Sequence, residues 1–254
     1  MPANFRDLGG LPVRGGWIAP SRVYRGAGIH LLDRGAVTAL DTEHGIRGFV
    51  DLRSLREVEL DGVAPVGAGQ TRYAVPIEPS LDALRSVAPH DLLPAGYLVM
   101  VVERAPALVL ALRSIAAALD LGAVVVHCVA GKDRTGVAIA ALLGLLGAAD
   151  DTVIEDYAAS DRAHPDILEV YRHSPSAAAL AGQLPAHLHR APRAAMEKLI
   201  RYVHLRYDGW EGWADWAGVP PGCVESLRSL VTSEATAFSS FSPPRQGADD
   251  AAHG

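Results

Sequence analysis

The residue types that can do chemistry in this chain are concentrated at positions 127–136, which read His-Cys-Val-Ala-Gly-Lys-Asp-Arg-Thr-Gly. An apolar run at 123–126 precedes them and another at 137–146 follows, which predicts a buried strand, a tight loop and a buried helix. Cys128 begins the loop and Arg134 ends it, with five residues between them. Backbone N–H groups of such a loop and of the helix N-terminus converge on an anion. The pattern therefore predicts a pocket for a phosphate dianion, and we call residues 128–134 the phosphate loop.

The side chains of this loop suggest distinct roles in the pocket. The planar fork of Arg134 can bind two phosphate oxygens. Cys128 is the expected nucleophile, because the loop dipoles favour its thiolate. Thr135 is expected to hydrogen-bond that thiolate and ease its departure, although an ordinary first-turn hydroxyl that satisfies a free N–H is a compatible alternative. The expected phosphate-binding residues are Val129, Ala130, Gly131, Lys132, Asp133 and Arg134.

Two residues of the loop region have open alternatives. The side chain of His127 alternates away from Cys128 along the strand, so we expect it to bond to backbone and steady the thiolate. A satisfied core histidine is the alternative. Lys132 is expected to place a second cation at the rim of the pocket, for a second anionic group on the substrate, and a solvated charge is the alternative.

The loop resembles the His-Cys-x5-Arg-Thr/Ser signature of the cysteine-dependent protein tyrosine phosphatase superfamily. Its interior and three further blocks resemble the bacterial tyrosine/lipid phosphatase family, typified by a secreted mycobacterial enzyme. The blocks are Asn-Phe-Arg-Asp-Leu-Gly-Gly at 4–10, Asp-Leu-Arg and a later Glu at 51–57, and Glu-Asp-Tyr-x-x-Ser at 155–160. The resemblance implies an α/β fold, a central mostly parallel sheet flanked by helices. It also implies hydrolysis of phosphomonoesters through a phosphocysteine intermediate, with no metal and no cofactor.

The resemblance leaves the general acid open between two aspartates. Many tyrosine phosphatases supply it from a Trp-Pro-Asp loop, but no such tripeptide occurs here and the corresponding residues 75–79 contain no Asp. Asp133 lies inside the phosphate loop, as in lipid-directed relatives in which that Asp is the proposed acid. Asp51 is the rival, because it ends a strand at the same edge of the sheet. The alternative role of Asp51 is an ion pair with Arg134 or with Arg53, a supporting residue, and Asp133 is the preferred acid.

The substrate is not defined by these residues. The resemblance implies phosphotyrosine in proteins, with phosphoserine, phosphothreonine and phosphoinositides as secondary activities. A small phosphorylated metabolite is the alternative within enzymes. A phosphate-binding protein without turnover and a rhodanese-like sulfur carrier are the alternatives from other classes.

Composition limits the remaining possibilities. A chain of 254 residues, with 49% hydrophobic and 20% charged residues, predicts one globular domain over 1–232. Residues 233–254, rich in Ser, Pro, Gly, Asp and Ala, are expected to form a disordered tail. The net charge of −6 argues against nucleic acid as a partner. The two cysteines, the absence of a secretory signal in the first ten residues and the lack of a long apolar run predict a cytoplasmic protein without a membrane span. No oligomeric state is indicated.

Local patterns predict most of the elements. Asp33 begins a helix that Gly45 ends, and Ser54 with Glu57 forms a capping box. Thr152 with Glu155 predicts a second capping box. Residues 4–10 are expected as turn-forming scaffold near the active-site edge. Two short strands are expected within 11–30, further strands at 48–52, 71–77 and 124–126, and helices at 92–103, 106–119, 165–171, 193–206 and 222–230. Strand, loop and capped helix alternate, as in a parallel sheet with crossover helices.

Overall fold

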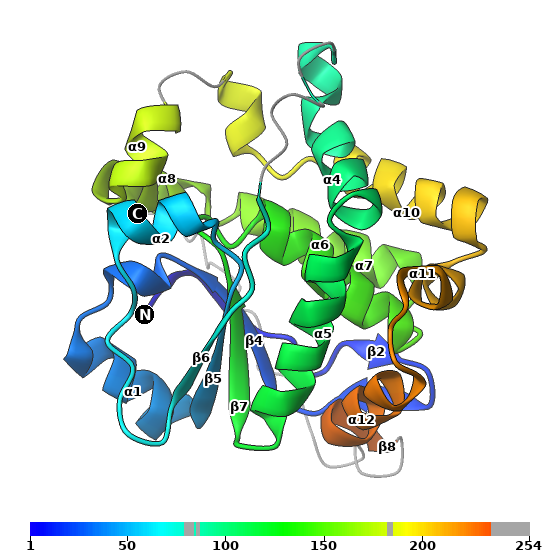
Figure 1. Ribbon diagram of the computed structural model, residues 1–254, viewed down its shortest axis with the longest axis horizontal. Coiled ribbons are helices and arrows are strands. Elements are labelled where there is room, and N and C mark those ends of the chain that lie inside the picture. The colour runs from blue at the N-terminus through cyan, green and yellow to red at the C-terminus, as the bar shows by residue number, and fades with distance from the viewer. Residues whose placement is uncertain (79–83, 85–86, 182–184, 235–254) are drawn as a thin grey trace, which may run out of the picture.

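The structure is a computed structural model that describes the chain except residues 79–83, 85–86, 182–184 and 235–254. Its centre is a five-stranded sheet in the order β1-β4-β7-β5-β6 (Figure 1). Neighbouring strands are parallel except for β1, which is antiparallel to β4. This confirms the α/β fold with a mostly parallel sheet. The strands are β1 (Ala3–Asp7), β4 (Val23–Ala27), β5 (Ile46–Asp51), β6 (Thr71–Ala74) and β7 (Ala123–His127).

The central strands are buried along their whole length, as a parallel sheet covered on both faces requires. Every residue of β4 and β7 is buried. Successive valines of β7 face opposite sides of the sheet, because side chains alternate along a strand. Val124 and Val126 pack in the larger apolar cluster, whereas Val125 packs with Val37 and Leu40 of α1. The helices flanking the sheet include α1 (Arg34–His44), α5 (Ala105–Leu119) and α6 (Asp133–Leu145).

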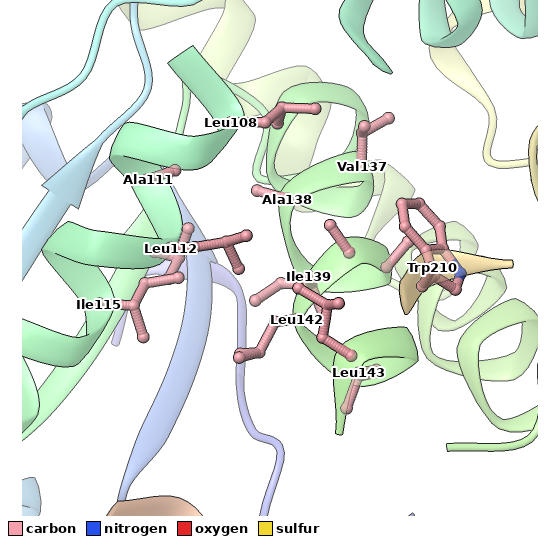
Figure 2. Close-up of a cluster of buried hydrophobic side chains, with 14 of the residues drawn as sticks. Leu108, Ala111, Leu112, Ile115, Val137, Ala138, Ile139, Leu142, Leu143 and Trp210 are labelled. Atoms are coloured by element: carbon pink, nitrogen blue, oxygen red, sulfur yellow. The ribbon is translucent and has the colours of Figure 1, made fainter. Parts of the chain in front are cut away.

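The larger core lies around α6, the helix that follows the phosphate loop. Figure 2 shows Leu112 of α5 directed toward Ile139 and Leu142 of α6, with Trp210 on the opposite side of that helix. Trp210 can approach because residue 144 is glycine, where an added Cβ would lie 2.0 Å from the indole ring. This close packing fixes the position of the helix whose first turn carries the catalytic candidates.

The remaining elements complete the layers and frame one end of the sheet. In Figure 1, α2, α8 and α9 lie together at the end where β5 and β7 finish, the edge at which parallel sheets place ligand sites. A small second sheet has the order β2-β3-β8. These elements are β2 (Pro12–Val13), β3 (Gly16–Ile18), β8 (Thr232–Glu234), α2 (Leu55–Asp61), α4 (Leu92–Val102), α7 (Asp150–Ala158), α8 (His164–His173), α9 (Pro175–Ala181), α10 (Arg193–Tyr207), α11 (Trp210–Ala217), α12 (Pro221–Val231) and the 3-10 turns Ile29–Leu31, Pro89–Asp91, Ala159–Asp161 and Ala186–His189.

Three of the four predicted helix-end signals are confirmed. The Asp33 side chain accepts from the Ala36 N–H at the start of α1, and Gly45 ends that helix with φ of 66°. Ser54 and Glu57 form both hydrogen bonds of the capping box. The second predicted capping box is wrong, because α7 begins at Asp150 and no side chain caps it. The helix has therefore already started before Thr152.

Two predictions about the chain termini need correction. Residues 4–10 do not form turns alone, since Ala3–Asp7 is the edge strand β1. The predicted boundary at 232/233 falls inside strand β8, because Thr232–Glu234 pair with Gly16–Ile18. The predicted disorder of the tail concerns residues 235–254, which lie outside the described residues.

No single helix among the described residues is long and apolar enough to cross a membrane. One pair, Pro89–Val102 with Ala105–Leu119, reaches that length and composition together, and its two halves are bent by 74°.

Candidate active site

The phosphate loop connects the end of β7 to the start of α6, as the sequence predicts. Cys128 is buried at its beginning, with 2% of its surface exposed. Gly131 adopts a φ of 60° and lies against the end of β4, where an added Cβ would be 2.2 Å from the Gly26 carbonyl oxygen. Only glycine satisfies both the left-handed backbone and this close approach. The packing of the loop on β4 therefore depends on the glycine of the motif.

The carbonyl groups of the loop are held by partners outside the pocket. The Val129 carbonyl accepts from the Gly28 N–H at 3.0 Å, and the Lys132 carbonyl accepts from the Gly136 N–H at 2.8 Å. Asn4 of β1 donates to the carbonyls of Ala130 and Gly131, and Arg25 of β4 also donates to that of Gly131. Because C=O and N–H point in opposite directions across a trans peptide, the loop N–H groups turn toward the pocket.

The guanidinium of Arg134 is held by Glu57. Its Nη1 donates to Oε2 at 2.5 Å and its Nη2 donates to Oε1 at 2.7 Å. Burial opposes the charge of Arg134, but the Glu57 hydrogen bonds and nearby negative groups, including Cys128, raise its pKa above the ordinary value. Burial likewise acts against the Glu57 carboxylate, and the hydrogen bond from Arg134 leads the causes that lower its pKa. Sequence reasoning placed Glu57 in a capping box and missed this pair.

Asp51 lies behind the pocket in an ion-pair network. The carboxylate accepts from Arg53 at 2.9 and 2.8 Å and from Arg72 at 2.9 Å, and 1% of its side chain is exposed. Burial raises its pKa, but His127, Arg53 and Arg72 together bring that pKa well below the ordinary value. The structure thus shows the ion pair with Arg53 that was the alternative role of Asp51. The partner of Arg134 is Glu57 instead.

His127 is buried between this network and the loop. Its Nδ1 lies 3.4 Å from the Cys128 carbonyl oxygen and 3.9 Å from Asp51 Oδ1. Burial is the largest cause that lowers the pKa of His127 to about 4. The imidazole is therefore neutral at neutral pH, and its contact is with backbone, as the sequence analysis expects.

Asp133 is the more accessible of the two candidate acids. Its Oδ1 accepts from the Tyr97 hydroxyl at 2.6 Å and from the Lys132 ammonium at 2.8 Å. The Tyr157 hydroxyl lies 2.6 Å from that of Tyr97, so a chain of two phenols ends on this oxygen. No hydrogen bond reaches Oδ2 from the described residues, and 29% of the Asp133 side chain is exposed. One oxygen of the carboxylate is thus held in place, whereas the other is not.

Lys132 does not lie at the rim of the pocket, and it is not a solvated charge. Its side chain is fully buried. The ammonium donates to Asp133 Oδ1 and to the carbonyls of Leu188 and Arg190, at 3.0 and 2.9 Å. Its three N–H groups are therefore all used within the protein. The expectation of a rim cation is wrong, because backbone carbonyls far along the chain provide the acceptors.

Two further side chains border the loop. The Thr135 hydroxyl is buried and has no hydrogen-bond partner among the described residues. Tyr171 of α8 packs near Val129, and its ring lies 5.5 Å from that of His189. Burial, followed by the charges of Asp133 and Cys128, raises the pKa of Tyr171. Tyr171 was not predicted, because nothing in the sequence links it to the loop.

The described part of the chain contains no group of three His, Cys, Asp or Glu side chains that could hold a metal ion. A family model described as "Tyrosine phosphatase family" matches residues 2–233. No curated protein matches the chain significantly.

Proposed function

Because this chain belongs to the tyrosine phosphatase family, we propose that it hydrolyses phosphomonoesters through a phosphocysteine intermediate, with phosphotyrosine in proteins as the substrate class. The observation that carries the proposal is the phosphate loop, in which carbonyls are held outward and Arg134 is locked by Glu57. Such preorganised donors typically contribute about 3–4 kcal/mol each to transition-state stabilisation.

The first chemical step is an in-line attack of the Cys128 thiolate on phosphorus. The S–P bond forms while the bond from phosphorus to the ester oxygen breaks, and Asp133 transfers its proton to that departing oxygen. Loop amides and Arg134 bind the equatorial oxygens throughout. In the second step a water molecule gives a proton to the Asp133 carboxylate and attacks phosphorus, and the S–P bond breaks. The Thr135 hydroxyl, which has no hydrogen-bond partner in the described part of the chain, is available to donate to the departing thiolate.

The contrast between the two aspartates supports Asp133 as the acid. Asp51 is buried, and Arg53 and Arg72 donate to both of its oxygens. Asp133 has one oxygen held by Tyr97 and Lys132, and the other has no partner among the described residues. A general acid must reach the leaving group and exchange protons, which the partly exposed carboxylate can do.

The aromatic side chain nearest the loop is compatible with an aryl phosphate. The charges of Asp133 and Cys128 act on Tyr171, and the His189 ring lies 5.5 Å from the Tyr171 ring. Aromatic pairs contribute about 0.5–1.5 kcal/mol beyond area burial. A small phosphorylated metabolite is the other substrate class. A turnover screen of phosphopeptides, phosphoinositides, phosphorylated sugars and nucleotides distinguishes them.

The Cys128→Ser variant tests the mechanism. It should lose phosphatase activity and still bind phosphate or vanadate, because only the nucleophile is removed. Cys223→Ser, at the other cysteine of the chain, is the matched control and should keep normal activity. If the activity of Cys128→Ser were within tenfold of the wild-type activity, the proposal would be refuted.

A further inference from the structure

The Gly131 carbonyl at the centre of the phosphate loop accepts two hydrogen bonds from behind. Asn4 Nδ2 lies 2.9 Å from this oxygen and Arg25 Nη2 lies 2.8 Å from it. Asn4 Nδ2 also lies 3.3 Å from the Ala130 carbonyl. A carbonyl oxygen has two lone pairs, so the hydrogen bonds from Asn4 and Arg25 occupy both lone pairs of the Gly131 oxygen. The orientation of this peptide is thereby fixed from outside the pocket.

Holding the carbonyl also acts on the opposite side of the peptide. In a planar trans peptide, the N–H of Lys132 points away from the Gly131 oxygen, toward the pocket. A hydrogen bond from a charged guanidinium is about twice as strong as a neutral one, and it polarises the groups bonded in series with it. Arg25 therefore makes this N–H a better donor for a phosphate oxygen.

Both donors are anchored by a buried network. Arg25 also donates to Asp156 Oδ2, and Arg6 Nε donates to Asp156 Oδ1 at 2.9 Å. Arg6 Nη1 donates to Asn4 Oδ1 at 2.5 Å, which turns the NH₂ group of Asn4 toward the loop carbonyls. Arg6 Nη2 also donates a hydrogen bond to Ser160 Oγ, at 3.2 Å.

The network carries a positive charge. Arg6 and Arg25 share the single carboxylate of Asp156. Burial and the neighbouring Arg25 lower the pKa of Arg6 to about 10, so it stays charged at neutral pH. An excess of positive charge beside the loop favours binding of the phosphate dianion, since charges interact strongly at low dielectric.

We propose that Asn4 and Arg25 are positioning residues of the phosphate loop, which orient and polarise its N–H groups from the face opposite the substrate. This role rests on the proposed function, because it concerns how the loop holds phosphate. It explains why the blocks at 4–10 and 155–160, which have no chemistry of their own, are brought together behind the loop.

The test uses the full-length protein and three variants. Arg25→Met removes the guanidinium. Asn4→Asp keeps the size of the side chain and suits the positive φ of residue 4, 51°, but it cannot donate to the carbonyls. Arg22→Met is the matched control, because Arg22 directly precedes β4 and donates to the carbonyls of Leu230 and Leu119, away from the loop.

The readouts are protection of Cys128 from iodoacetate by inorganic phosphate, and kcat and KM measured separately for an aryl phosphate. Both are measured at a temperature where circular dichroism shows native structure. Arg25→Met should weaken phosphate protection and lower kcat/KM by about tenfold or more. Asn4→Asp should act in the same direction, and Arg22→Met should leave both readouts within about threefold.

Wild-type protection and turnover in Asn4→Asp and in any folded Arg25→Met protein would overturn the proposal. Equal losses in Arg22→Met would also overturn it, since they would reflect general destabilisation. If Arg25→Met does not fold, Asn4→Asp decides. Phosphate protection can be measured without turnover. If the wild type is inactive but is protected by phosphate, and the Asn4→Asp and Arg25→Met variants lose that protection, the proposed function is refuted and the positioning role is supported.

Discussion

Glu57→Gln offers a sharp test of how the reactive arginine is held. Glutamine at the third position of a helix still completes a capping box with Ser54, so α2 should keep its start. The carboxamide has one acceptor oxygen in place of two, and its NH₂ group opposes the guanidinium of Arg134. The substitution therefore breaks the two-point contact and leaves the local fold in place.

The expected loss follows from the geometry of that contact. Hydrogen bonds to charged groups contribute about 1.5–3 kcal/mol each. The side chains of Arg134 and Glu57 are 15% and 20% exposed, so solvent screening places the loss at the lower end. We expect transition-state stabilisation to fall by about 1.5–2 kcal/mol, which is about a 10- to 30-fold decrease in kcat/KM.

The assay is steady-state hydrolysis of an aryl phosphate at neutral pH. Ser54→Ala is the control, because it removes the hydroxyl that caps α2 and leaves the Glu57–Arg134 contact in place. It should lower thermal stability and change kcat/KM by less than about threefold. A Glu57→Gln enzyme with wild-type kcat/KM, or an equal loss in Ser54→Ala, would refute the reasoning.

Three further predictions follow from the site. Asp133→Asn should slow hydrolysis of alkyl phosphates far more than that of an activated nitrophenyl phosphate, because only poor leaving groups need the proton. Asp51→Asn should slow hydrolysis of both substrates alike. The reverse pattern would exchange the roles of the two aspartates. His30 and His127 have pKa values lowered to about 4, burial being the largest cause, so the unfolded chain binds protons below about pH 6.5 and the folded protein does not. The free energy of unfolding should therefore be highest above about pH 6.5 and should fall by about 2 kcal/mol per histidine between pH 7 and pH 5. Urea unfolding measured across this range should show a shallower fall for His127→Asn. An unchanged fall in that variant would contradict the assignment. EDTA should leave turnover unchanged, since the proposed chemistry uses no metal, and inhibition that a divalent ion reverses would contradict it.

The sequence predicts the parts of the fold that depend on neighbouring residues. The strand, loop and helix around Cys128, and the two ends of α1, follow from apolar runs and capping residues. The strand β1 was missed because Asn4, Asp7 and the paired glycines at 9 and 10 are residue types typical of turns, whereas the pairing of β1 with β4 is a long-range contact.

The site shows the same division between local and distant information. The Glu57–Arg134 contact joins residues 77 positions apart, and no spacing rule connects them. Lys132 is buried because the carbonyls of Leu188 and Arg190 accept from it, and every residue type carries such a carbonyl. The residues of the phosphate loop could be identified from type and spacing, whereas the partners that hold them could not.

The contacts behind the loop also have a consequence for the order in which the protein folds. Asn4 and Gly131 are 127 positions apart, and Arg25 and Gly131 are 106 apart. Contacts of such high sequence separation form late, because chain entropy must be lost before they stabilise anything. During synthesis the start of the chain must wait for more than half of the protein to emerge. Strand β4 pairs with β7 across a similar separation, with Arg25 opposite Val126, so catalytic competence should appear in refolding together with the central sheet and not before it.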